Sequence, residues 1–169
     1  IKGYYSFVHR TINKLFKESI IAKVKAGKAY LCSLNLEKEK TSILIQLSEI
    51  ERRKELYEEN KDLRLILNDF VKSLESQSKI LFIVLFGSYS KGIAAKESDI
   101  DLLLLCNRDV NTRKIIKEIY SKYGKEINSI IMTPNDFKNQ KNKTLIKEII
   151  NNHHVLYGVE NFVRIMFRK

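Results

Sequence analysis

The chain has 169 residues, of which 44% are hydrophobic and 30% are charged, enough for a hydrophobic core in one large or two small domains. It has neither an apolar run of about 18 residues nor a signal-peptide pattern, which excludes a membrane-spanning helix and gives no sign of export. The formal net charge of +11 is concentrated at the ends, because residues 1–34 and 138–169 each hold seven basic residues against one and two acidic ones. Basic segments at both ends indicate a polyanionic partner such as nucleic acid. The alternative is that they only keep the protein soluble.

The two cysteines, Cys32 and Cys106, are far apart and lack metal-ligand spacing. We interpret them as ordinary thiols in a reducing compartment and expect a cytoplasmic protein.

The first 36 residues predict a helix followed by a β-hairpin. Apolar residues recur at helical spacing over residues 4–18. Two strand-like runs, residues 20–25 and 28–34, flank Ala26-Gly27, where glycine permits the positive φ of a tight turn.

Residues 37–77 have a helical pattern with a break near Asn60, which predicts two amphipathic helices. We expect them to pack onto a domain, and they could also supply a homodimer contact. From Lys79 onward strands and helices alternate. The predicted strands are residues 80–86, 100–105, 127–132 and 155–157, and the predicted helices are residues 112–123, 145–151 and 159–167, with a further helix starting at Pro134.

These patterns predict an α/β (α+β) fold in three parts. Residues 1–36 form the helix and hairpin, residues 37–77 form the linking or packing helices, and residues 78–169 form the α/β domain.

One short stretch carries the clearest chemistry. A buried strand leads to Gly87-Ser88, where the missing Cβ lets backbone approach a phosphate, and Ser88 starts a short helix whose free N–H groups favour an anion. Asp99 and Asp101 follow at the start of the next strand. Their two-residue spacing points both carboxylates to one face, and such a pair suits Mg²⁺ together with substrate phosphates.

The stretch closely resembles the polymerase β-like nucleotidyltransferases, in particular their minimal branch. The family pattern is matched at nine positions, which are Gly87, Ser88, Ser90, Lys91, Gly92, Ser98, Asp99, Asp101 and Leu102. The resemblance covers roughly residues 60–169. It implies a small mixed sheet with helices on one face, Mg²⁺, and ATP or another nucleoside triphosphate held by Gly87, Ser88, Ser90 and Lys91.

The third carboxylate that this family usually supplies has no clear counterpart. Asn128 occupies the aligned position, and Glu126 lies two residues earlier on the same predicted strand face. The candidate catalytic set is therefore Asp99, Asp101, Glu126 and Asn128, with Asp99 and Asp101 as metal ligands. Among weaker candidates, His153 and His154 could bind a metal but more often pack, and Tyr89 could stack on a base or fill the core.

The N-terminal helix and hairpin resemble the second half of a winged helix-turn-helix. This resemblance implies a DNA-facing helix, with contacts from Ser6, His9, Arg10 and Asn13, and a wing that reaches phosphates through Lys23, Lys25 and Lys28. A supporting helix and hairpin without a DNA role is the structural alternative.

Taken together, the patterns predict a Mg²⁺-dependent nucleotidyltransferase that transfers a nucleoside monophosphate from ATP to an unidentified hydroxyl. The main alternative is a DNA-binding transcriptional regulator whose nucleotidyltransferase-like domain senses nucleotide without catalysis. A third reading is a toxin–antitoxin component that binds a small helical protein.

Overall fold

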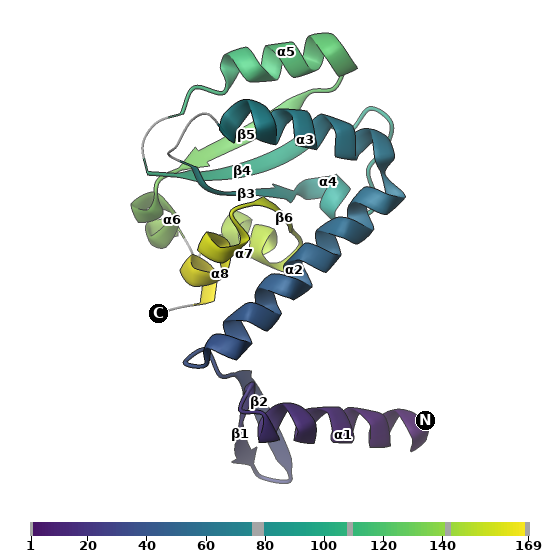
Figure 1. The fold of residues 1–169 in the computed structure, drawn as a ribbon, viewed down its shortest axis with the longest axis vertical. Coiled ribbons are helices and arrows are strands. Elements are labelled where there is room, and N and C mark those ends of the chain that lie inside the picture. Colours follow the sequence, from purple (N-terminus) through teal and green to yellow (C-terminus); the bar gives the residue numbers. More distant parts are fainter. Residues whose placement is uncertain (1, 76–79, 108–109, 141–142, 168–169) are drawn as a thin grey trace. The chain divides into compact units, whose positions relative to one another are not determined.

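The computed structural model describes residues 2–75, 80–107, 110–140 and 143–167 (Figure 1). Contacts divide the chain into two compact units. The first runs up to Ser48 and also takes the residues from Val163 onward, and the second is Glu49–Phe162.

The N-terminal unit contains a helix, a hairpin and the first turns of a long helix. Its elements are α1 (Lys2–Lys17), β1 (Ile21–Ala26), β2 (Ala29–Leu34) and the start of α2 (Glu39–Glu59). The strands are antiparallel, and Gly27 in the turn between them has φ +61°. The predicted helix followed by a hairpin is therefore confirmed.

Ile20 joins these elements. Its N–H donates to the carbonyl of Leu15, and its own carbonyl accepts from the Asn35 N–H at 2.8 Å and from the Thr41 hydroxyl at 3.4 Å. Ile20, Ile21 and Thr41 are buried. In contrast, most large apolar side chains of α1 and the hairpin are exposed, including Tyr4, Tyr5, Phe7, Tyr30 and Leu31.

Helix α2 ends at Glu59, and α3 (Lys61–Glu75) begins after Asn60, where a break was predicted. The Leu56 carbonyl, near the end of α2, accepts from the Asn60 backbone N–H at 3.0 Å and from the Asn60 side-chain amide at 3.1 Å. The predicted helical residues 76–77 and the proposed boundary at 77/78 lie outside the described residues. Within the described ranges, no helix is both long and apolar enough to cross a membrane.

The second unit is built on a four-stranded sheet in the order β5-β4-β3-β6. Strands β4 and β5 are parallel, and the other two neighbouring pairs are antiparallel. The elements are β3 (Ile80–Phe86), α4 (Gly87–Ser90), β4 (Ile100–Cys106), α5 (Arg113–Tyr123), β5 (Ile127–Met132), α6 (Pro134–Gln140), α7 (Thr144–Asn151), β6 (His154–Tyr157) and α8 (Val159–Phe167). The mixed sheet is as predicted.

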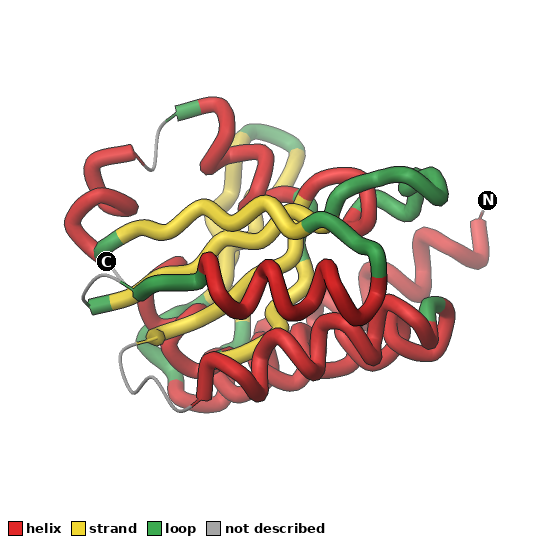
Figure 2. Tube along the Cα trace, turned by 90° about the horizontal axis from the view of Figure 1, so that it is seen from above, coloured by secondary structure: helices red, strands yellow, loops and turns green. Residues whose placement is uncertain are grey.

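Helices cover both faces of this sheet. Helices α3 and α5 lie on one face and α6 and α7 on the other (Figure 1), and Figure 2 shows the strands between helices from above. Ile100, Leu102 and Leu104 belong to the core under α3 and α5, whereas Leu103 and Leu105 alternate to the other face and are also buried. The expectation of helices on one face is corrected, because an apolar run buried on both sides needs cover on both.

Candidate active site

Gly87 forms the turn that ends β3. Its φ of +74° is the left-handed conformation that side chains with a Cβ rarely adopt. A Cβ placed on Gly87 would lie 2.1 Å from Oδ2 of Asp101. Glycine is thus required twice here, for the backbone conformation and for the close approach of a carboxylate.

Asp101 is held at this position by strand pairing. It lies opposite Phe86 of β3 on one side and opposite Asn128 of β5 on the other. Asp99 is one residue before β4, and Ile100 between the two aspartates is fully buried on the opposite face. The register therefore gathers Gly87, Asp99, Asp101 and Asn128, and we call these four residues the carboxylate site.

The carboxylates of this site influence each other. Partial burial is the main cause that raises the pKa of Asp101 above its ordinary value. The Asn128 amide opposes this shift and the Asp99 charge adds to it. The Asn128 amide also donates to Oδ2 of Asp99 at 3.2 Å. A cation would relieve the repulsion, and the hard oxygen atoms of two carboxylates fit Mg²⁺ that completes its shell with water and phosphate.

The third acidic position is not filled by a carboxylate. Asn128 is exposed and lies against Asp99. Glu126 is exposed, just before β5, and its backbone carbonyl accepts from the Ile100 N–H at 2.9 Å. Among the described residues, no group of three His, Cys, Asp or Glu side chains could hold a metal ion. A metal here would rest on Asp99 and Asp101.

The residues after Gly87 form a tethered turn. No side chain caps the start of α4. The Ser90 hydroxyl lies 2.9 Å from the Gly87 carbonyl and 3.0 Å from the Asn152 carbonyl, so its proton anchors the turn rather than a ligand. Lys91 pairs with Glu148 at 2.5 Å. Ser88 is half-buried, and its carbonyl accepts from the N–H groups of Lys91 and Ile93.

Two supporting residues were not predicted from the sequence. Glu148 and Asn152, from α7 and the residue that follows it, contact Lys91 and Ser90 across 57 and 62 residues of sequence. No local sequence motif predicts such long-range contacts. Tyr89 packs against the α3-side core, with the Lys125 ammonium 5.8 Å from its ring centroid.

The histidine pair has a packing role. His153 is buried; its Nε2 lies 3.4 Å from the buried Glu49 carboxylate, and its Nδ1 lies 2.9 Å from the Ile150 carbonyl. His154 is half-buried, and burial lowers its pKa below the ordinary value. Neither histidine joins a metal-binding group within the described part of the chain.

The residues predicted to contact DNA lie in the N-terminal unit. Ser6, His9 and Arg10 are exposed on α1, and Lys25 and Lys28 are exposed on the hairpin. Lys23 is different, because its ammonium donates to the Asn13 side chain at 2.5 Å and lies over the Phe16 ring. Lys23 and Asn13 thus bind each other, and the DNA role of the whole set stays a prediction.

Comparison with known proteins relates the second unit to characterised families. The family model for polymerase β nucleotidyltransferases matches residues 68–161, more than half of the chain. A candidate protein adenylyltransferase of Methanocaldococcus jannaschii is 29% identical over 114 residues, which cover 62% of this chain and 78% of that protein. A second candidate protein adenylyltransferase of the same organism is 32% identical over 94 residues, covering 54% of this chain and 94% of that protein.

A solved toxin–antitoxin structure with AMP-PNP aligns with a TM-score of 0.46 and 20% identity, over 59% of this chain and 82% of that one. The residues that the family model matches include Gly87, Asp99 and Asp101. The chain therefore belongs to the polymerase β nucleotidyltransferase family.

Proposed function

We propose that the chain is a Mg²⁺-dependent adenylyltransferase that moves AMP from ATP to a hydroxyl group of a protein. The observation that carries this proposal is the carboxylate site, where the Asp101 side chain lies against Gly87 and beside Asp99. The names of the two Methanocaldococcus jannaschii relatives support a protein as the acceptor.

In this reaction the acceptor oxygen bonds to the α-phosphorus of ATP, and the bond from that phosphorus to the bridging oxygen breaks. Pyrophosphate leaves, and the hydroxyl proton passes to solvent. Asp99 and Asp101 would hold Mg²⁺, which offsets the phosphate charge when bound. The uncapped N–H groups at the start of α4 would bind phosphate oxygens, and the missing Cβ of Gly87 lets the Asp101 carboxylate lie against this turn. Asn128 would orient Asp99 and cannot take a proton.

The experiment has a binding arm and a transfer arm. Calorimetry with a non-hydrolysable ATP analogue should show a Mg²⁺-dependent component of binding, and this component should be lost in Asp99→Asn/Asp101→Asn. When the purified chain is added to a heat-inactivated cell extract, label should enter protein from α-labelled ATP but not from γ-labelled ATP, since only nucleotidyl transfer retains the α-phosphate. Asp101→Asn should lower the label at least about 100-fold.

Asp62→Asn is the matched control, because Asp62 is an exposed α3 aspartate outside the carboxylate site. It should keep both binding and transfer. Mg²⁺-dependent binding that survives Asp99→Asn/Asp101→Asn would refute the proposed site, and label from γ-labelled ATP would refute the reaction class.

A second candidate function concerns the N-terminal unit alone. We propose that α1 and the hairpin contact DNA, and the support is the exposure of Arg10, Lys25 and Lys28 on a basic segment. Anisotropy with a labelled duplex should give an affinity that falls steeply with salt and falls further in Arg10→Ala. A DNA affinity that does not change with salt, or that does not change in Arg10→Ala, would refute a DNA-binding role for the N-terminal unit.

A further inference from the structure

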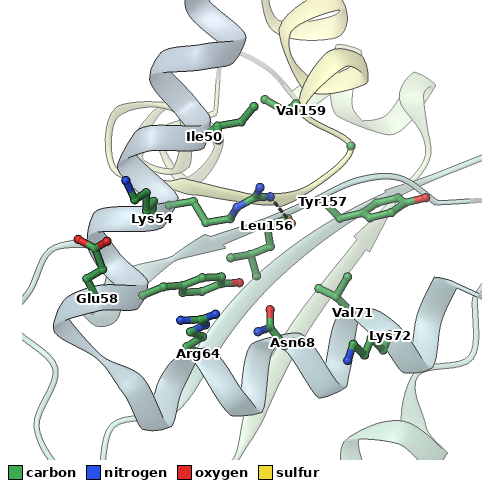
Figure 3. Close-up of a pocket in the computed structure, with 13 residues that line it drawn as sticks. Ile50, Lys54, Glu58, Arg64, Asn68, Val71, Lys72, Leu156, Tyr157 and Val159 are labelled. Carbon is green, nitrogen blue, oxygen red and sulfur yellow. Dashed lines mark hydrogen bonds between the residues drawn. The ribbon is translucent and has the colours of Figure 1, made fainter.

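A cavity of about 670 Å³ lies between α2, α3 and the end of β6. Figure 3 shows Arg64 and Asn68 on α3 facing Leu156 and Tyr157 of β6, with Lys54 and Glu58 contributed by α2. We call this cavity the α2–α3 pocket. Its volume is within the range of about 300–1,000 Å³ that small-molecule sites occupy. All its lining residues belong to the second unit.

The pocket is strongly cationic. Arg53, Lys54, Arg64 and Lys72 line it, against the single acidic residue Glu58. Two of these cations have partners within the protein. Arg53 donates to the carbonyls of Val155 at 3.3 Å and of Leu156 at 2.6 Å, and Lys54 lies 3.9 Å from Glu51.

Arg64 is a lining cation whose side chain lacks a hydrogen-bond or ion-pair partner among the described residues. Its side chain is exposed, and across the described residues it makes no ion pair or hydrogen bond to another side chain or carbonyl. A guanidinium in this state presents a planar set of N–H donors that matches a phosphate group. Asn68 lies one turn further along α3 on the same side and adds an amide donor and acceptor (Figure 3).

The remaining walls are aromatic and apolar. Tyr57 and Tyr157 are half-buried, and Leu156 is buried. Burial is the main cause that raises the pKa of the Tyr57 phenol, although Arg53 and Arg64 oppose it, so this phenol keeps its proton and can donate to an anion. Aromatic rings beside a cationic cluster suit a ligand that is flat at one end and anionic at the other.

We propose that the α2–α3 pocket binds a nucleoside phosphate, with the phosphate on Arg64 and the base against Tyr157. The pocket shares no lining residue with the carboxylate site. Along β6, His154 pairs with Leu85 near the Gly87 turn, while Tyr157 pairs with Ile83 further back along β3. The ligand site is thus a second one, separate from the metal-dependent site, and it does not depend on the proposed adenylyl transfer.

The test isolates the pocket by removing the other site. ATP is titrated calorimetrically into Asp99→Asn/Asp101→Asn in excess EDTA, so that metal-dependent binding cannot contribute. ATP should bind, and adding Arg64→Gln should weaken its affinity about tenfold or more, because a charge-assisted hydrogen bond is lost. Arg113→Gln is the matched control, an exposed helical arginine on α5, and should change the affinity less than twofold.

Two further probes separate phosphate from nucleoside. Tripolyphosphate should bind at least about tenfold more weakly than ATP, because it lacks the base. Tyr157→Leu should weaken ATP while leaving tripolyphosphate unchanged. The proposal is overturned if ATP fails to bind in EDTA, if Arg64→Gln binds like Arg113→Gln, or if tripolyphosphate matches ATP. The Mg²⁺-dependent measurement on the wild-type chain is unaffected by any of these results.

Discussion

The carboxylate site and the β6 edge of the same sheet are built in different ways. At the carboxylate site, Gly87, Asp99, Asp101 and Asn128 come together through the register of three neighbouring strands. At the β6 edge, side chains of α2 reach carbonyls that are more than a hundred residues away in sequence. Strand register fixes residue positions through the backbone, so the carboxylate site depends on a glycine and on the two-residue spacing of its aspartates. The β6 edge depends instead on individual long side chains.

The β6 edge shows how an edge strand is protected. Arg52 donates to the His153 carbonyl at 2.8 Å, and Arg53 donates to the carbonyls of Val155 and Leu156. These guanidinium groups bind backbone carbonyls in and just before β6, and such charged side chains disfavour pairing with a further strand. Arg52 also pairs with the buried Glu49, which contacts His153. Positively charged arginine side chains thus cover the β6 edge, whereas the carboxylate site brings two negatively charged side chains together.

The largest effect should come from Gly87→Ala. The new Cβ would collide with Oδ2 of Asp101 at 2.1 Å in a strained backbone conformation, so we expect a loss of about 3 kcal/mol of unfolding free energy and of Mg²⁺-dependent nucleotide binding. Urea unfolding and calorimetry measure the two losses. Gly124→Ala is the control, with φ +64° and no atom near its Cβ, and should cost only about 1–2 kcal/mol. Equal losses of unfolding free energy in Gly87→Ala and Gly124→Ala would show that strand register does not hold Asp101 against Gly87.

Next in size, Glu49→Gln should destabilise the β6 edge by about 2 kcal/mol at neutral pH, because the buried carboxylate no longer accepts charge-assisted hydrogen bonds from Arg52. Glu51→Gln, in an exposed pair on the same helix, should cost less than about 0.5 kcal/mol in the same urea titration. Similar costs for the two variants would refute a special role for the buried pair.

The Glu49 effect should depend on pH. Burial acts to raise the pKa of Glu49, but His153 and Arg52 outweigh it and hold this pKa below its ordinary value of 4.5. A depressed carboxyl pKa stabilises the fold above the unfolded-state pKa, and this stabilisation is lost as pH falls through the folded-state value. The difference between wild type and Glu49→Gln should therefore shrink as pH falls below 4.5. A difference that grows on acidification would contradict this assignment.

Asn128→Asp tests the missing third carboxylate. Its side chain would stand beside Asp99, where the Asn128 amide now lies 3.2 Å from Oδ2, so we expect about a tenfold gain in Mn²⁺ affinity. Metal titration monitored by calorimetry measures the gain. Asn139→Asp, at an exposed position on α6, should leave the affinity unchanged. An unchanged affinity in Asn128→Asp would mean that the position does not reach the metal.

The smallest effect is expected for Ser90→Ala, which removes the hydroxyl between the Gly87 and Asn152 carbonyls. The expected loss is about 1 kcal/mol in urea unfolding, the usual value for one hydrogen bond. Ser73→Ala removes a similar contact to the Asp69 carbonyl within α3 and should be nearly neutral, because alanine favours helix. If Ser90→Ala and Ser73→Ala lose the same unfolding free energy, the hydrogen bond to Asn152 does not stabilise the turn.

Local sequence determined most of the secondary structure and the centre of the site. Continuous apolar runs predicted β3 and β4, and the glycine-serine turn with aspartates two residues apart predicted that Gly87, Asp99 and Asp101 lie together, because side-chain alternation and backbone conformation are local properties. The family pattern also located Asn128 beside Asp99.

Only the tertiary structure decided how distant segments meet. Asn152 and Glu148 restrain the turn, Arg52 and Arg53 close the β6 edge, and Gly158 lies so close to β3 that a Cβ would meet the Leu81 carbonyl at 2.0 Å. The α2–α3 pocket likewise joins residues from two helices and a strand near the end of the chain. Long side chains can reach a carbonyl or a cavity from many sequence positions, so such contacts leave no periodic pattern, and packing alone brings them together.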